Sequence, residues 1–144
     1  FFDYYQSGDA SLRLDCGSRI EGIGRPRVEA SFLPKVIDAM IKVPDALSLA
    51  AMHYLAQRLG RHVGGSSGTN LIGALVAAQQ MIADGEKGSI VAILCDSGER
   101  YATTYYDQDW LKAQGYELDG LIATVAASVE RGEPLPDNVL RAGI

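Results

Sequence analysis

Basic clusters, paired cysteines and long apolar runs are all missing or rare in this sequence. Thirteen basic residues stand against eighteen acidic ones, for a net charge of −5, and the basic residues are scattered along the chain. Without a stripe of basic and aromatic residues, nucleic acid is not expected as a partner. The longest apolar run, residues 71–78 with Gly73 counted, is far below the roughly 20 residues that a bilayer requires, so no membrane partner is expected either.

Cysteine is scarce as well, and its positions form no recognisable framework. Cys16 and Cys95 are the two cysteines, and they match neither a metal-binding spacing nor a set of disulfides. A reducing, cytoplasmic location is therefore expected. The sequence begins with Phe1 and carries no signal-peptide pattern, which we interpret as the interior of a longer protein.

Helix-like and strand-like segments alternate along the chain. Four segments have the apolar spacing of helices: residues 32–40, 45–59, 68–84 and 119–131. Three segments have the composition of strands: residues 41–43, 61–65 and 89–95. The last of these is continuously apolar, as in a strand buried on both faces of a parallel sheet. The alternation predicts an α/β fold, a three-layer domain with a mostly parallel sheet, in which ligands bind at the carboxyl ends of the strands.

A Gly/Ser turn, residues 64–68, overlaps the end of the second of these strands and leads into a long apolar helix. Its glycines at positions 64, 65 and 68 are expected to hold backbone where a Cβ would collide with a neighbour. The start of a helix offers unpaired N–H groups and a partial positive charge, which suit a phosphate, a carboxylate or the polar edge of a cofactor ring. The Gly/Ser turn is therefore predicted to bind a ligand, with a flexible linker as the alternative.

Two further segments are candidates for ligand contacts. Residues 96–101 follow the most apolar strand and carry a carboxylate, a hydroxyl, a glycine and a cation. A purely structural alternative is a polar loop in which Asp96 or Ser97 caps a helix that begins near Tyr101. Residues 20–27 contain two glycines one residue apart, which fits either a backbone close to a ligand or a simple turn.

The three segments together, in this order, resemble the C-terminal half of fold type II pyridoxal-phosphate enzymes of the cysteine synthase and cystathionine β-synthase family. The likeness covers residues 18–115, and residues 24–27 look most similar to bacterial cysteine synthases or cysteine desulfhydrases. It implies β-replacement or β-elimination on cysteine or O-acetylserine-type substrates. It also implies a pyridoxal 5'-phosphate cofactor, a small amino-acid substrate and a homodimer in the full-length protein.

The resemblance assigns roles to individual residues. Ser66 matches the serine whose hydroxyl hydrogen-bonds the pyridine nitrogen of the cofactor. Gly24 matches a glycine whose backbone lies beside the cofactor and the bound amino acid. Asp96 and Ser97 match the loop at the far side of the pyridine nitrogen, which Tyr101 is expected to hold in place against the sheet.

Arg25 and Arg27 depart from the family pattern, since small or aromatic residues follow this turn in ordinary cysteine synthases. Two cations at the site entrance would recruit an anionic second substrate or a substrate carboxylate. A solvated surface pair is the alternative. A further departure is Cys95, which stands where many relatives have proline and is expected to be buried and inert.

Other conspicuous side chains are assigned to packing. His53 lies within an apolar helix face and is expected to pack there rather than act as a base. The aromatic residues between positions 101 and 110 have helical spacing and large apolar area, and we expect them in a core or a dimer interface.

In this family the lysine that bonds the cofactor, the phosphate-binding loop and the asparagine beside the ring all lie upstream of the matching region. The four lysines of the chain stand in none of those contexts: Lys35, Lys42, Lys87 and Lys112. We therefore interpret residues 1–144 as a C-terminal, large-domain fragment without the lysine-bearing part and without activity alone. A non-catalytic phosphate- or nucleotide-binding α/β module that uses the Gly/Ser turn is the alternative from another class.

Overall fold

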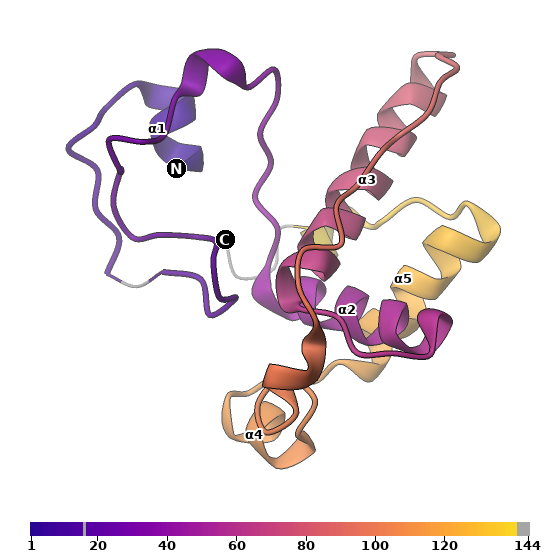
Figure 1. Cartoon of the computed structure of the whole chain (residues 1–144). Helices are drawn as coiled ribbons and strands as arrows, with labels where there is room; N and C mark the ends of the chain where they lie inside the picture. The colour runs from indigo at the N-terminus through magenta and orange to yellow at the C-terminus, as the bar shows by residue number, and fades with distance from the viewer. Residues whose placement is uncertain (16, 141–144) are drawn as a thin grey trace. The chain divides into compact units, whose positions relative to one another are not determined.

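The computed structural model describes residues 1–15 and 17–140 of the chain (Figure 1). Cys16 lies outside the described residues, as do residues 141–144. The chain divides into two compact units, of which unit 1 is Phe1–Lys42 and unit 2 is Val43–Ile144. No helix in the described ranges has the length and apolar character needed to cross a bilayer.

Unit 1 consists largely of loops, with one short helix, α1 (Phe2–Ser7), and one 3₁₀ turn, η1 (Pro34–Val36). Its two ends are joined by an ion pair between Lys42 Nζ and Asp3 Oδ1 at 3.1 Å. The rings of Phe1 and Phe32 also stack, with centroids 4.5 Å apart. These contacts hold the loops together in place of regular secondary structure.

The predicted helix over residues 32–40 is wrong, because the segment forms only the η1 turn. Two of the apolar residues that suggested a helix are left uncovered, since Leu33 is 60% exposed and Val36 is 75% exposed. Short helices depend on burial of their apolar face, which this segment does not achieve. The predicted strand at residues 41–43 has no ladder partner among the described residues and does not form.

Unit 2 is built from three main helices, α2 (Asp45–Leu59), α3 (Gly65–Ala83) and α5 (Asp119–Arg131) (Figure 1). Shorter elements complete it: η2 (Gly98–Tyr101), α4 (Gln108–Ala113) and α6 (Asp137–Leu140). The predictions for residues 45–59 and 119–131 are confirmed. Helix α3 begins at Gly65, three residues earlier than predicted, and Gly64 before it has the extended backbone of an N-cap.

The core of unit 2 lies around α2, which packs against both α3 and α5. Six buried side chains form its centre: Leu47, Ala51, Tyr54, Ile72, Val125 and Leu135. Helix α3 approaches α2 closely at Gly68, where an added Cβ would overlap the backbone of Ser48 and Met52. The Thr69 hydroxyl donates to the Ser48 hydroxyl at 2.9 Å beside this contact.

The predicted parallel sheet is not present in the described part of the chain. Backbone pairing there is limited to two isolated antiparallel bridges, Arg13↔Arg27 in unit 1 and Val63↔Ser97 in unit 2. Residues 89–95, predicted as a strand buried on both faces, are exposed without exception, and Val91 is 91% exposed. A strand in a sheet pairs its backbone polar groups with those of neighbouring strands, and residues 89–95 have no such neighbour among the described residues.

Candidate functional site

The Gly/Ser turn lies directly against residues 96–98. The N–H of Gly64 donates to the carbonyl of Asp96 at 3.1 Å, next to the Val63↔Ser97 bridge. A Cβ at Gly64 would overlap the Asp96 carboxylate, and one at Gly98 would lie 2.5 Å from the backbone of Val63. Two glycines thus allow two segments to pack backbone to backbone. The predicted lack of space for a Cβ is confirmed at Gly64 and Gly68.

Ser66 and Ser67 differ sharply although they are neighbours in the first turn of α3. Ser67 is buried, and its hydroxyl accepts a hydrogen bond from the N–H of Cys95 at 3.0 Å. Ser66 is half-buried, and its hydroxyl has no hydrogen-bond partner in the part of the chain that the structure describes. Ser67 therefore anchors the segment before Asp96, whereas no described contact engages the Ser66 hydroxyl.

Asp96 has one oxygen that is used and one that is not. Its Oδ2 accepts a hydrogen bond from the Tyr101 hydroxyl at 2.8 Å, and its Oδ1 is buried without a partner among the described residues. Tyr101 is itself buried, so it holds the loop as expected, although through Asp96 and not against a sheet. Ser97 caps η2, because its hydroxyl accepts from the N–H of Glu99 at 3.4 Å.

A contact that the sequence did not reveal joins Tyr106 to the residue before the Gly/Ser turn. The Tyr106 hydroxyl accepts from the N–H of Val63 at 3.0 Å and donates to the Val63 carbonyl at 2.8 Å. Burial raises the pKa of Tyr106, so the phenol keeps its proton at neutral pH. The helical spacing of the aromatic residues predicted packing, but no local pattern indicates which backbone a phenol will reach.

The two histidines both lie against Tyr106. The His62 ring stacks on the Tyr106 ring, with centroids 3.9 Å apart and planes 17° apart. His53 Nε2 donates to the Tyr105 carbonyl at 2.8 Å, and burial lowers the pKa of His53. His53 is therefore neutral at pH 7 and packs as the sequence predicted.

Cys95 differs from its prediction, because the structure places it on the surface. The amide of Asn70 donates to the Ile93 carbonyl at 2.8 Å and lies 3.4 Å from the Cys95 sulfur. The expectation of a buried cysteine depended on residues 89–95 forming an inner strand. It fails for the same reason that the strand does.

In unit 1, residues 17–26 form a closed loop around a hollow of about 310 Å³. The N–H of Ser18 donates to the Gly24 carbonyl at 2.9 Å and closes the loop. Gly24 has φ of +65°, and a Cβ there would overlap Ser18. The position therefore requires glycine by conformation and by space.

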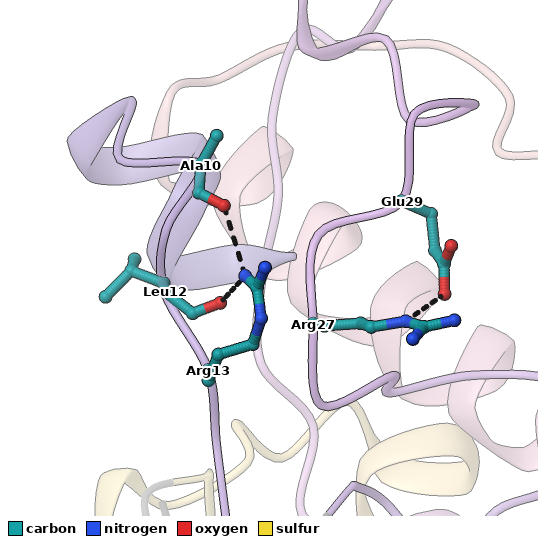
Figure 2. A network of polar contacts seen from close by, with 5 residues as sticks. All are labelled: Ala10, Leu12, Arg13, Arg27 and Glu29. Carbon is teal, nitrogen blue, oxygen red and sulfur yellow. Dashed lines mark hydrogen bonds and ion pairs between the residues drawn. The ribbon is translucent and has the colours of Figure 1, made fainter.

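Arg25 and Arg27 are not equivalent. Arg27 Nε pairs with Glu29 Oε1 at 3.1 Å, opposite Arg13, which donates to two backbone carbonyls (Figure 2). Arg25 lines the hollow and has no ion-pair partner in the described ranges. Arg27 is thus engaged in an ion pair with Glu29, and no such partner is described for Arg25.

The predicted site residues fall into two groups. Ser66, Asp96 and Ser97 belong to unit 2, where the Gly/Ser turn and residues 96–98 bring them together. Gly24, Arg25 and Arg27 belong to unit 1. Within the described residues, no group of three or more His, Cys, Asp or Glu side chains is arranged to hold a metal ion.

Comparisons with curated proteins give a consistent set of relatives, although no family model matches the chain. Over 125 residues the chain is 50% identical to the L-cysteine desulfhydrase Cds1 of Mycobacterium tuberculosis, a match of 87% of this chain. It is 30% identical over 109 residues to a cysteine synthase of Dictyostelium discoideum. Against a cystathionine beta-synthase of the same organism it is 36% identical over 99 residues.

These matches cover much of this chain but little of each relative. The cysteine synthase match takes in 76% of this chain and the cystathionine beta-synthase match 68%. The matched regions make up 34% of the length of the desulfhydrase, 28% of the cysteine synthase and 19% of the cystathionine beta-synthase. The chain thus spans about a third or less of the length of the curated relatives it matches.

Proposed function

Because the chain belongs to the fold type II pyridoxal-phosphate family of cysteine synthases and cystathionine β-synthases, we propose that it is part of an enzyme that removes or replaces the β-substituent of cysteine or an O-acetylserine-type amino acid. The 50% identity to an L-cysteine desulfhydrase supports cysteine as the substrate. A non-catalytic nucleotide-binding module is not favoured, since the relatives are named as enzymes of cysteine metabolism.

The residues at the Gly/Ser turn fit the polar edge of the family's cofactor. Ser66 presents a hydroxyl without a described partner, and Asp96 Oδ1 is a buried acceptor that lacks a donor. Both stand beside the N-terminus of α3, which favours electronegative groups. When bound, pyridoxal phosphate supplies an electron-withdrawing ring that activates the substrate's α-carbon. That free hydroxyl is the observation that carries the proposal.

Ser66 supplies a neutral hydrogen bond to the ring nitrogen in this proposal. A hydroxyl does not hold a proton on that nitrogen as a carboxylate would, which favours loss of the β-substituent over transamination. Asp96 acts indirectly in this proposal, by holding the turn that carries Ser66. Its carbonyl holds Gly64, and Tyr101 fixes its carboxylate, so the turn that carries Ser66 stays in position.

Arg25 and Gly24 serve the substrate in this proposal. The Gly24 backbone lies beside the bound amino acid, and the free guanidinium of Arg25 takes the carboxylate or an anionic second substrate. Arg27, paired with Glu29, keeps the loop in shape.

The test uses the complete protein that contains this chain, loaded with cofactor. Sulfide release from L-cysteine is compared with cysteine formation from O-acetylserine and sulfide, and the faster reaction identifies the activity. Ser66→Ala should weaken cofactor binding by about 0.5–1.5 kcal/mol, since one hydrogen bond is lost. Ser66→Asp should shift the cofactor spectrum and lower the β-elimination rate.

Thr124→Ala is the matched control, because Thr124 donates to the Gly120 carbonyl of its own helix. Cofactor spectra and rates that stay unchanged in both Ser66 variants would contradict the assignment. Arg25→Ala should raise KM with little change in kcat, and Arg27→Ala should change neither. Equal effects from the two arginines would show that Arg25 has no special role.

The chain by itself is proposed to be inactive. Lys42 is paired with Asp3, and the other three lysines are exposed. Purified residues 1–144 should retain no cofactor after dialysis and release no sulfide beyond free cofactor. A cofactor adduct on any of the four lysines that supports turnover would overturn this.

For the complete protein we also propose a homodimer and a cytoplasmic location. Light scattering tests the first and cell fractionation the second.

A further inference from the structure

Unit 2 contains a cleft of about 460 Å³ that is separate from the residues assigned to the cofactor. It lies at the end of α2, and the chain that follows this helix forms part of its wall. Six of its lining side chains matter here: His53, Gln57, Arg61, His62, Glu99 and Tyr106. None of the roles proposed above uses this cleft.

Two opposite charges line the cleft without neutralising each other. Arg61 is exposed and has no ion-pair or hydrogen-bond partner among the described residues. The Glu99 side chain is 75% exposed, and its carboxylate lies 3.8 Å from His62 Nδ1, which is beyond hydrogen-bond distance. His62 Nδ1 itself is buried without a hydrogen-bond partner in the described ranges. The cleft thus offers an anion-binding group and a cation-binding group at once.

The end of α2 adds a second preference for a cation. The last carbonyls of a helix lack intrahelical partners and carry a partial negative charge. Ala56, Gln57 and Gly60, from the last turn of α2 and its C-cap, line the cleft. Nothing lies within 4 Å of a Cβ placed on Gly60, so the space beside this C-cap residue is unfilled.

The aromatic side chains that line the cleft, His53, His62 and Tyr106, offer a contact surface without a free polar group on His53 Nε2 or the Tyr106 hydroxyl. The Tyr106 hydroxyl is occupied by Val63, and His53 uses Nε2 on the Tyr105 carbonyl. The stacked rings of His62 and Tyr106 form a flat apolar surface beside the charged groups. A small side chain or methylene group fits against such a surface.

We propose that this cleft binds a free α-amino acid as its zwitterion. The carboxylate is held by the Arg61 guanidinium and the Gln57 amide. The ammonium group is held by the Glu99 carboxylate and the last carbonyls of α2. This binding does not depend on the cofactor or on the proposed reaction, so it is tested apart from both.

The experiment titrates the complete protein that contains this chain, isotope-labelled and free of cofactor, with three probes at constant ionic strength and follows the ring signals of His53, His62 and Tyr106 by NMR. The probes are glycine, sodium acetate and methylammonium chloride. Glycine should bind in the millimolar range and about tenfold more tightly than either half-molecule, a difference of about 1.4 kcal/mol. Acetate or methylammonium binding as tightly as glycine would overturn the proposal, as would no saturable shift with glycine.

Two variants assign the ends of the ligand. Arg61→Ala should lower glycine affinity several-fold, and Glu99→Gln should reduce glycine binding to the level of acetate. The matched controls are Arg58→Ala, whose side chain pairs with Glu130, and Glu117→Gln, whose side chain is exposed. Neither control residue lines the cleft, so both variants should bind glycine normally. Loss of binding in a control, or normal binding in Arg61→Ala, would contradict the proposed contacts.

Discussion

Two apolar segments of unit 2, the first half of α2 and residues 89–95, have opposite fates. Residues 47–52 of α2 are buried throughout. Residues 89–95 are even more continuously apolar, yet every one of them is exposed. Figure 1 shows this stretch running back along α3, and Asn70 and Ser67 of that helix hold its end at the Ile93 carbonyl and the Cys95 N–H.

The difference teaches that hydrophobicity alone does not decide burial. A helix satisfies its own backbone hydrogen bonds and needs only a surface to pack on, which α3 and α5 give to α2. An extended segment must also find partners for its N–H and C=O groups. Within the described residues, the Ile93 carbonyl and the Cys95 N–H of this segment find such partners in side chains of α3.

The largest expected effect tests burial directly. Leu47→Ala removes a fully buried side chain from the core and should lower the free energy of unfolding by about 2–5 kcal/mol. Ile93→Ala, at a side chain that is 69% exposed, should change it by less than about 0.5 kcal/mol. Urea unfolding of the 144-residue chain measures both. A similar loss in the two variants would mean that residues 89–95 are buried in solution.

A smaller effect is expected where α3 meets α2. Gly68→Ala should cost about 1–3 kcal/mol, because the new methyl group meets the α2 backbone, which cannot move aside as a side chain would. Gly73→Ala is the control on the same helix. No atom lies within 4 Å of its added Cβ, so this variant should gain about 0.5–1 kcal/mol from helix propensity. Destabilisation by both would show that helix α3 tolerates no alanine for reasons other than this contact.

The hydrogen bond between α3 and residues 89–95 should contribute less to the free energy of unfolding than either of these contacts. Ser67→Ala removes the acceptor for the Cys95 N–H and should cost about 1 kcal/mol, and Ser66→Ala should leave the stability of the 144-residue chain unchanged. Amide hydrogen exchange at Cys95 reports the contact itself and should speed up in the Ser67 variant alone. Faster exchange in the Ser66 variant would show that this hydroxyl, too, supports the loop.

The smallest expected effect is the loss of stability at acidic pH that protonation of His53 causes. Because burial lowers the pKa of His53 below its unfolded value near 6.5, folding favours the neutral ring. Stability is therefore full above about pH 6.5 and falls as the pH drops below it, since the unfolded chain binds the proton more readily. His53→Gln should flatten the dependence of the urea midpoint on pH in this range, because the side chain that takes up the proton is gone. A pH profile of the His53 variant as steep as that of the unchanged chain would contradict the assignment.

The sequence predicted helices α2 and α5 well, because their apolar spacing is a local property that their packing preserves. It failed for residues 89–95 and 32–40, because the burial of these segments depends on neighbours that lie elsewhere. The close packing at Gly64 was also predictable, since the glycine pattern indicates a position without space for a Cβ, but its neighbour Asp96 was not. The ion pair of Arg27 with Glu29 was not predictable either. Arg25 and Arg27 are the same residue type, and only the geometry of the loop decides which of them lies within reach of Glu29.

The hydrogen bonds of Tyr106 have a consequence for how far backbone pairing can spread. At the Val63↔Ser97 bridge, Gly64 pairs with Asp96, and the polar atoms of Val63 are taken up by the Tyr106 hydroxyl. A further strand arriving at Val63 would find its donor and its acceptor already satisfied by one phenol. Tyr106 thus terminates this two-segment ribbon as a side-chain substitute for the next strand, a protection against edge-to-edge aggregation that the exposed residues 89–95 do not share.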